Sequence, residues 1–107
     1  MNYKLIPAPP FERELKQLAK KYASLPNDLL LLEGQLLKNP TLGTPIGKNC
    51  FKIRLSIQSK GKGKSGEARI ITYVQIVNEK IFMIAIYDKS SFENISNKEL
   101  QTRLKNL

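Results

Sequence analysis

The feature that most constrains the fold of this chain is a change of hydrophobic period near its middle. Up to residue 38, the apolar residues recur every three or four positions, which is the period of an α-helix. Over residues 51–58, and less regularly over 68–77, they alternate with polar residues, which is typical of half-buried β-strands. A chain that places its helices first and most of its strands afterwards predicts an α+β fold.

Two helices are expected in the first half. The first spans residues 9–22 and begins with prolines, which fit the first turn because its backbone N–H groups have no partner inside the helix. The second has Ser24 as its expected N-cap and ends at Asn39, before a proline. Since Ala23 alone separates them, they are predicted to form an antiparallel helical hairpin.

The remaining elements follow from alternation and from turn residues. A short strand is expected over residues 3–6, and the glycine- and proline-rich residues 40–49 are predicted to be a loop. Asn78 and Glu79 are expected to form a tight hairpin turn. The other expected elements are strands over 51–58, 68–77 and 81–87 and a terminal helix over 98–107, with Leu100, Leu104 and Leu107 facing inward.

The resulting order, β-α-α-β-β-β-α, predicts a single domain over residues 1–107. Its last three strands would form an antiparallel sheet that carries the helical hairpin on one face and leaves the other partly open. The strand over 81–87 is apolar throughout, so we place it centrally, buried on both faces.

The charge of the chain indicates its partners. Eighteen Lys and Arg residues against nine Asp and Glu give a net charge of +9, which favours an acidic partner such as nucleic acid, an anionic membrane or an acidic protein. The chain has no histidine and a single cysteine, which excludes His-dependent catalysis, a disulfide and a cysteine-rich zinc site. With no signal peptide and no apolar run long enough to span a membrane, we expect a soluble, cytoplasmic protein.

Basic residues from several elements are predicted to converge. Lys52 and Arg54 share one face of a strand, and Arg69 opens the next strand on the same face as Tyr73. Such a surface can neutralise phosphates, and an exposed tyrosine can stack on a base. The alternative is an ordinary solvated hairpin, but the total charge favours binding to nucleic acid, most readily RNA. The loop between the strands adds three lysines at the rim, which are Lys60, Lys62 and Lys64.

These residue types also permit RNA cleavage without a metal or another cofactor. The acidic residues Glu67, Asp88 and Glu93 match no metal-binding motif, so no metal site is expected. In RNA the 2′-hydroxyl is itself the nucleophile. The protein therefore only has to remove its proton, stabilise the charge on the phosphorane and assist the leaving oxygen, which Lys, Arg and Tyr side chains can do.

Four segments resemble a known family: FERELKQLAKKY, LLKNPTLGTPIG, FKIRLSIQSKGKGKSGEARIITYV and IYDKSSFENIS. Together they are similar to the RelE/ParE superfamily of bacterial toxins, and closest to its RelE/HigB-like branch. The resemblance implies a type II toxin–antitoxin system whose toxin cleaves mRNA at the ribosomal A site without metal. It also implies a cognate antitoxin, encoded nearby, that binds the toxin in a hetero-oligomer.

The resemblance also assigns roles to residues. It implies that Lys52, Arg54 and Arg69 act in catalysis or RNA binding and that the loop lysines bind RNA. Lys89 corresponds to a lysine after the last strand and is a further candidate catalytic residue. The sequence departs from the family in three places. Ser90 and Ser96 stand near an expected arginine and an expected tyrosine, for which Tyr73 or Tyr87 could substitute, and Glu67 replaces a usual glycine.

The leading hypothesis is therefore a ribosome-dependent mRNA endonuclease. Lys52 or a loop lysine is its candidate base, while Arg54 and Arg69 hold the scissile phosphate. One alternative is a ParE-like toxin that inhibits DNA gyrase, and another is a non-catalytic or decayed member of the family that binds RNA. In each toxin reading, the antitoxin is expected to cover the basic residues or to displace the terminal helix over 98–107.

Overall fold

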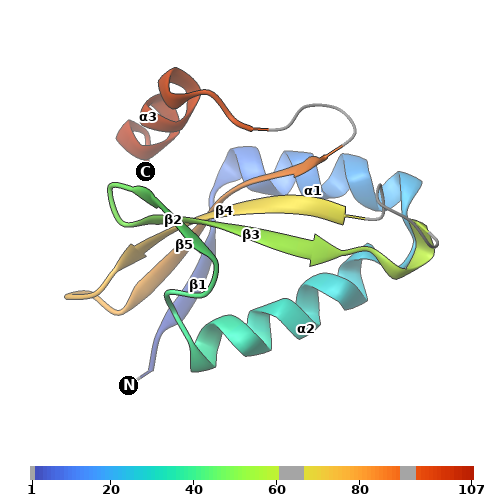
Figure 1. The fold of residues 1–107 in the computed structure, drawn as a ribbon, viewed down its shortest axis with the longest axis horizontal. Coiled ribbons are helices and arrows are strands. Elements are labelled where there is room, and N and C mark those ends of the chain that lie inside the picture. The colour runs from blue at the N-terminus through green and yellow to red at the C-terminus, as the bar shows by residue number, and fades with distance from the viewer. Residues whose placement is uncertain (1, 61–66, 90–93) are drawn as a thin grey trace.

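The computed structural model of the chain describes residues 2–60, 67–89 and 94–107. It confirms the expected α+β fold, with three helices and a five-stranded sheet among these residues (Figure 1). The elements in chain order are β1 (Lys4–Pro7), α1 (Pro9–Lys21), α2 (Leu25–Lys38), β2 (Thr44–Gly47), β3 (Cys50–Ser56), the 3-10 turn η1 (Gln58–Lys60), β4 (Glu67–Gln75), β5 (Lys80–Asp88) and α3 (Asn97–Lys105).

The sheet is larger than the three antiparallel strands expected from the sequence. Its strand order is β1-β5-β4-β3-β2. The N-terminal strand β1 runs parallel to β5, with Lys4 opposite Lys80, while every other pair of neighbouring strands is antiparallel. The apolar strand β5 lies inside the sheet as predicted, but β4 and not β5 holds the middle position.

The prediction of a loop over residues 40–49 is wrong for residues 44–47, which form β2. This strand lies at the edge of the sheet, where Pro45 is tolerated because one side of the strand needs no ladder hydrogen bond. The turn into β3 contains Lys48 and Asn49, both with positive φ, as tight hairpin turns of the primed type require. Before β2, Gly43 has a φ of 107°, and a Cβ there would come within 2.6 Å of the Lys52 carbonyl oxygen, so only glycine fits.

The two faces of the sheet carry different hydrophobic clusters. Helix α1 packs on β5 and helix α2 on β3, and both cover one face, as the predicted hairpin required. Helix α3 contributes Leu100 to the cluster of the opposite face, and in Figure 1 it lies apart from α2, across the strands. The residues of the helix-covered cluster include Phe11, Leu25, Leu29, Leu32, Leu36, Ile53, Leu55, Ile70, Ile81 and Met83, and those of the opposite cluster are Cys50, Ile71, Ile84, Ala85, Tyr87 and Leu100.

Some local expectations are corrected. Strand β4 ends at Gln75, and Val77 is 95% exposed in a turn that is wider than expected and in which Glu79, not Asn78, has the positive φ. Helix α3 ends at Lys105, so Leu100 is buried as predicted but Leu107 lies beyond the helix and is exposed. Ser24 precedes α2, but its hydroxyl does not cap the helix and donates to the carboxylate of Asp28 instead.

No described helix is long and apolar enough to cross a membrane.

Candidate nucleic-acid interface

Three side chains of the expected site form one row across the sheet. In the strand register, Arg54 on β3 lies opposite Arg69 on β4, and Arg69 lies opposite Tyr87 on β5. Directly opposite residues of antiparallel strands project to the same face, with their Cβ atoms about 5 Å apart. Lys52 lies two residues before Arg54 and therefore on that face too. We call the surface formed by Lys52, Arg54, Arg69 and Tyr87 the basic face.

Arg69 is held in an unusual environment for a cation. Its side chain is only 8% exposed, and its Nε atom is buried without a hydrogen-bond partner among the described residues. Arg69 is also directly opposite Arg54 in the strand register, and like charges in directly opposite positions destabilise a sheet. An anion placed between the two arginines would neutralise their charges, and it would accept a hydrogen bond from the Arg69 Nε–H. Both the repulsion and the unpaired donor would then be removed.

Tyr87 supplies a neutral hydroxyl next to this pair. Its side chain is 4% exposed, and burial raises the pKa of the Tyr87 phenol, although a hydrogen bond with the Ile95 backbone and the charge of Arg69 act in the opposite direction. The phenol therefore stays protonated at physiological pH. Because the ring is buried, the geometry favours a role for its hydroxyl as a hydrogen-bond donor over stacking on a base.

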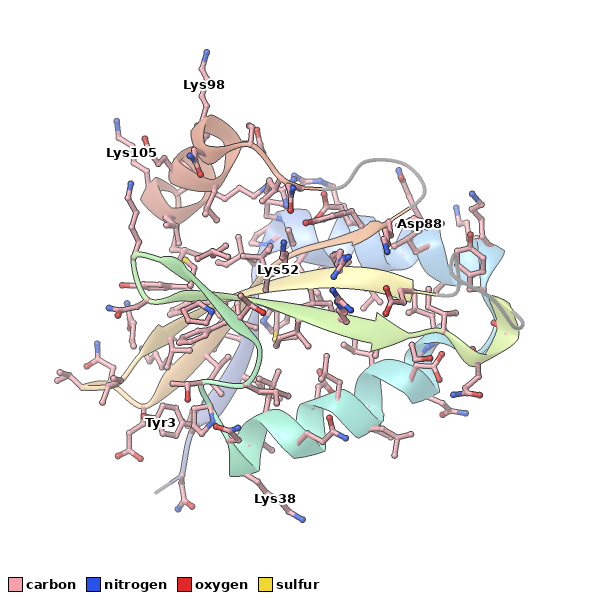
Figure 2. The ribbon with its side chains drawn as sticks, viewed as in Figure 1. Tyr3, Lys38, Lys52, Asp88, Lys98 and Lys105 are labelled. Atoms are coloured by element: carbon pink, nitrogen blue, oxygen red, sulfur yellow. The ribbon has the colours of Figure 1, made fainter. Side chains whose placement is uncertain are left out.

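Lys52 stands beside the row and is held by a residue distant in sequence. Its Nζ donates to Oδ1 of Asn94 at 2.9 Å. In Figure 2, Lys52 extends from β3 toward the side of the sheet on which α3 lies. A small cavity of about 150 Å³ separates it from α3, and the residues that line this cavity are Ile46, Lys52, Ile71, Tyr87, Asn94, Ile95, Asn97 and Leu100.

Tyr73 lies on the same face of the sheet but outside the row formed by Arg54, Arg69 and Tyr87. It lies four residues after Arg69 along β4, which is about 13 Å at the rise of an extended strand. Its ring packs against Phe82, with the ring centroids 6.0 Å apart. The structure therefore brings together Lys52, Arg54, Arg69 and Tyr87, and it leaves Tyr73 at the other end of the sheet.

The remaining predicted residues lie at the end of the strands. Lys89 follows β5, and its ammonium is 3.7 Å from the carboxylate of Glu67, the residue that stands in place of a usual glycine. Ser96 is the N-cap of α3, where its hydroxyl accepts from the Glu99 backbone N–H at 3.1 Å. Lys60 ends η1, and Lys62, Lys64 and Ser90 lie outside the described residues.

One cluster of polar residues, around Asp28, was not predicted from the sequence. Asp28 is 6% exposed, and its Oδ2 accepts from the Ser24 hydroxyl at 2.7 Å and from the Gln58 backbone N–H at 3.1 Å. The Ser59 backbone N–H donates to the Ser24 hydroxyl at 2.7 Å. These bonds fix η1, and so the start of the basic loop, to the first turn of α2. No local pattern marks the two bonds to η1, because their partners are 30 and 35 positions apart.

Helix α3 is anchored to the sheet mainly by Arg103. Its guanidinium donates to both carboxylate oxygens of Glu14 on α1, at 2.9 and 2.8 Å, and to the Ile84 carbonyl oxygen at 3.0 Å. It also bonds to Glu99 on its own helix at 2.8 Å. The hydrogen bonds to Glu14, and secondarily those to Glu99, raise the pKa of Arg103 despite its burial.

Among the described residues no group of His, Cys, Asp and Glu side chains is arranged to hold a metal ion. The chemistry of the basic face is thus that of cations and a phenol. It can bind a phosphate between two arginines, donate a proton from Tyr87 and move one through Lys52.

Comparison with known proteins identifies the family. Among solved structures, the chain is similar to that of an E. coli RelE toxin, a mutant in the free state, with a TM-score of 0.63 and 19% sequence identity. The match covers 100% of this chain and 99% of that one, and it shows a shared fold. The sequence itself matches, over residues 12–106, the family described as the RelE toxin of the RelE/RelB toxin–antitoxin system. The chain therefore belongs to the RelE toxin family, as the resemblance of its motifs predicted.

Proposed function

We propose that this toxin is a metal-independent endoribonuclease that cleaves mRNA on the ribosome, and that the basic face is its active site. The observation that carries the proposal is the row of Arg54, Arg69 and Tyr87 across three strands, with Lys52 beside it. A buried guanidinium with a free Nε, opposite a second arginine, is a site prepared for an anion, and in RNA that anion is the scissile phosphate.

The proposed reaction is an internal transfer within the RNA. The 2′-oxygen attacks the adjacent phosphorus and forms a bond to it, while the bond from phosphorus to the 5′-oxygen breaks. Lys52, in its neutral form, or a lysine of the basic loop accepts the proton of the 2′-hydroxyl. The phenol of Tyr87 donates a proton to the leaving 5′-oxygen. The products are a 2′,3′-cyclic phosphate and a 5′-hydroxyl, so no water, oxidant or metal enters this step.

The arginines contribute most where charge develops. In the phosphorane the equatorial oxygens carry more negative charge than in the bound phosphate, so fixed guanidinium groups stabilise the transition state more than the ground state. Removing one fixed donor of this type lowers the rate by about a hundred- to a thousandfold in other enzymes. Arg69 is the better fixed of the two, because the sheet encloses its side chain, whereas Arg54 is exposed.

The proposal is tested with purified toxin, ribosomes and a short mRNA. We expect a single internal cut in the ribosome-bound message, with a 2′,3′-cyclic phosphate on the upstream product. A message with a 2′-deoxynucleotide at the cut site should remain whole, because it lacks the nucleophile. Equal cleavage of the deoxy-substituted message would overturn the mechanism.

The matched protein control is a variant with both Arg54→Met and Arg69→Met, which removes the phosphate site and leaves Lys52 and Tyr87 in place. It should bind ribosomes more weakly and cut no message. If cells that produce the wild-type toxin stop growing while their mRNA stays intact, the nuclease proposal fails, and DNA damage in the same cells would support gyrase as the target.

A further inference from the structure

The segment Asn94–Ile95, which lies shortly before α3, contacts two residues of the basic face at once. Oδ1 of Asn94 accepts from Nζ of Lys52 at 2.9 Å. The backbone of the next residue, Ile95, is hydrogen-bonded to Tyr87. The Ile95 side chain packs in the apolar cluster beneath, so the segment lies against the sheet from one side. No motif or charge pattern singled out Asn94, and its contact with Lys52 spans 42 positions of sequence.

This segment is held in place from its C-terminal side. Ser96 caps α3, Leu100 is 5% exposed in the cluster of the same face, and Arg103 bonds to Glu14 and to the Ile84 carbonyl oxygen. Asn94 is itself exposed, but it lies two residues before Ser96, the N-cap of the anchored helix. The backbone that carries the amide is therefore anchored, and of the two side chains in the bond that of Lys52 is the longer and has more rotatable bonds.

The acceptor, the amide oxygen of Asn94, is neutral, which is compatible with a lysine that acts as a base and changes its charge. A lysine side chain has four rotatable carbons and about 2 kcal/mol of rotamer entropy, so an acceptor that selects one orientation removes part of this cost before RNA binds. A neutral amide oxygen accepts a hydrogen bond from an ammonium group and also from an amine. A carboxylate in its place would bind the ammonium form much more strongly and oppose its loss of a proton.

We propose that Asn94 is a positioning residue for Lys52, which holds the lysine Nζ at the edge of the basic face without fixing it in the ammonium form. The inference rests on the proposed function in that it takes Lys52 as the base. Within the cavity beside Lys52, Tyr87 is the other titratable side chain among the described residues, and Arg54 and Arg69 lie in the adjacent row.

Two variants and a control test the inference. Asn94→Ala should lower kcat about five- to tenfold and leave KM within about twofold, since orientation is lost but the phosphate site is not. Asn94→Asp should move the alkaline rise of the pH–rate profile to higher pH, because the new carboxylate stabilises the protonated lysine. Asn97→Ala changes another side chain that lines the same cavity and should alter neither quantity.

A double-mutant cycle separates positioning from folding. In a Lys52→Met background, Asn94→Ala should cause no further loss of residual cleavage, because its effect passes through Lys52. A further loss as large as in the wild type would show that Asn94 acts on something else, and it would overturn the inference.

A readout that does not depend on activity distinguishes the two proposals. The ¹³Cε resonance of Lys52 is followed against pH in the wild type and in Asn94→Asp, and its titration midpoint should be higher in the variant. If the midpoint rises but the wild type cleaves no ribosome-bound RNA, the proposed function fails and the contact stands. If the wild type cleaves RNA and neither the midpoint nor the pH–rate profile moves, Asn94 does not position Lys52.

Discussion

Arg69 combines a structural cost with a proposed functional gain. A nearly buried guanidinium whose Nε has no partner in the described part of the chain adds little to stability, and it faces a second arginine across the strand pair. Proteins retain such buried charges where a bound ligand supplies the missing partner. Substitution of Arg69 should therefore change stability and activity in opposite directions.

We therefore expect Arg69→Met to leave the melting temperature unchanged or to raise it, because the apolar side chain fills a similar volume without a buried charge. Cleavage of ribosome-bound RNA should fall by about a hundredfold or more. Thermal unfolding and single-turnover cleavage measure the two effects. Arg54→Met is the matched control, because it relieves the same charge repulsion but no burial of a charge. It should therefore lower cleavage and raise the melting temperature less than Arg69→Met does. A melting temperature several degrees lower for Arg69→Met would mean that Arg69 has a structural role.

The thiol of Cys50 is made unreactive by burial. It is 1% exposed, and burial raises the pKa of Cys50 from 9.0 to about 11, with a small opposing effect from Lys48. A thiol in this state is not a nucleophile at physiological pH, so it should react with a disulfide reagent no faster than the protein opens.

The same shift predicts how stability depends on pH. Because the pKa of the Cys50 thiol is higher in the folded than in the unfolded chain, its effect on stability is absent below pH 9 and appears as the pH rises toward 11. Over that range the unfolding free energy should fall by roughly 2 to 3 kcal/mol from this group. Denaturant unfolding of wild type and Cys50→Ala at several pH values checks this, and an equally steep fall in both would contradict it.

At the level of elements, one ion pair contributes to the position of α3 beside its apolar contacts. The Arg103 side chain is 14% exposed and that of Glu14 is 28% exposed, so the pair is neither fully buried nor a surface contact. Besides Arg103, the helix is attached to the sheet through Leu100 and Leu104.

Arg103→Met should therefore destabilise the docking of α3 by about 1 to 2 kcal/mol, between the values of exposed and buried ion pairs. Hydrogen exchange should show faster exchange in α3 and little change in β4. Lys105→Met is the control, because Lys105 lies on the same helix and points away from the sheet in Figure 2. Equal exchange rates in α3 of the Arg103→Met variant and the wild type would refute the anchoring role.

The sequence predicted those elements whose signals are local. A hydrophobic period in the sequence predicted the helices α1 and α2 and the strands β3, β4 and β5. The alternation also placed Lys52, Arg54 and Arg69 correctly on one face. Strand β2 was missed because its proline and glycines read as a loop. The choice of Tyr87 over Tyr73 depends on register between β4 and β5, and the contact from Asn94 depends on chain closure over 42 residues. Neither the strand register nor this long-range contact can be predicted from a local sequence pattern.

At the level of the whole molecule, a net charge of +9 makes association with RNA sensitive to salt. Family membership also implies an antitoxin partner. We propose that it covers the basic face or displaces α3, and an acidic or amphipathic segment would suit either position.

The salt dependence gives a direct measure of the phosphate contacts. For single-stranded RNA the logarithm of affinity falls with the logarithm of salt concentration by about 0.7 per neutralised phosphate. Arg54→Met should reduce this slope by about 0.7 between roughly 50 and 200 mM salt. Fluorescence anisotropy with a labelled RNA oligomer measures it. Lys98→Met should leave the slope unchanged, since Lys98 projects from α3 away from the sheet in Figure 2. A larger change for Lys98 than for Arg54 would place the RNA elsewhere.

The bonds of Arg103 have a consequence beyond α3. Strand β1 pairs with β5 only from Lys80 to Met83, so along the second half of that edge no strand of the described residues lies beside β5. There the Ile84 carbonyl oxygen is occupied by Arg103, and the Ile86 backbone N–H donates to Glu14 at 3.3 Å. Two side chains thus occupy positions that a strand from another molecule would use to extend the sheet. The ion pair that docks the last helix also protects this apolar strand from edge-to-edge aggregation.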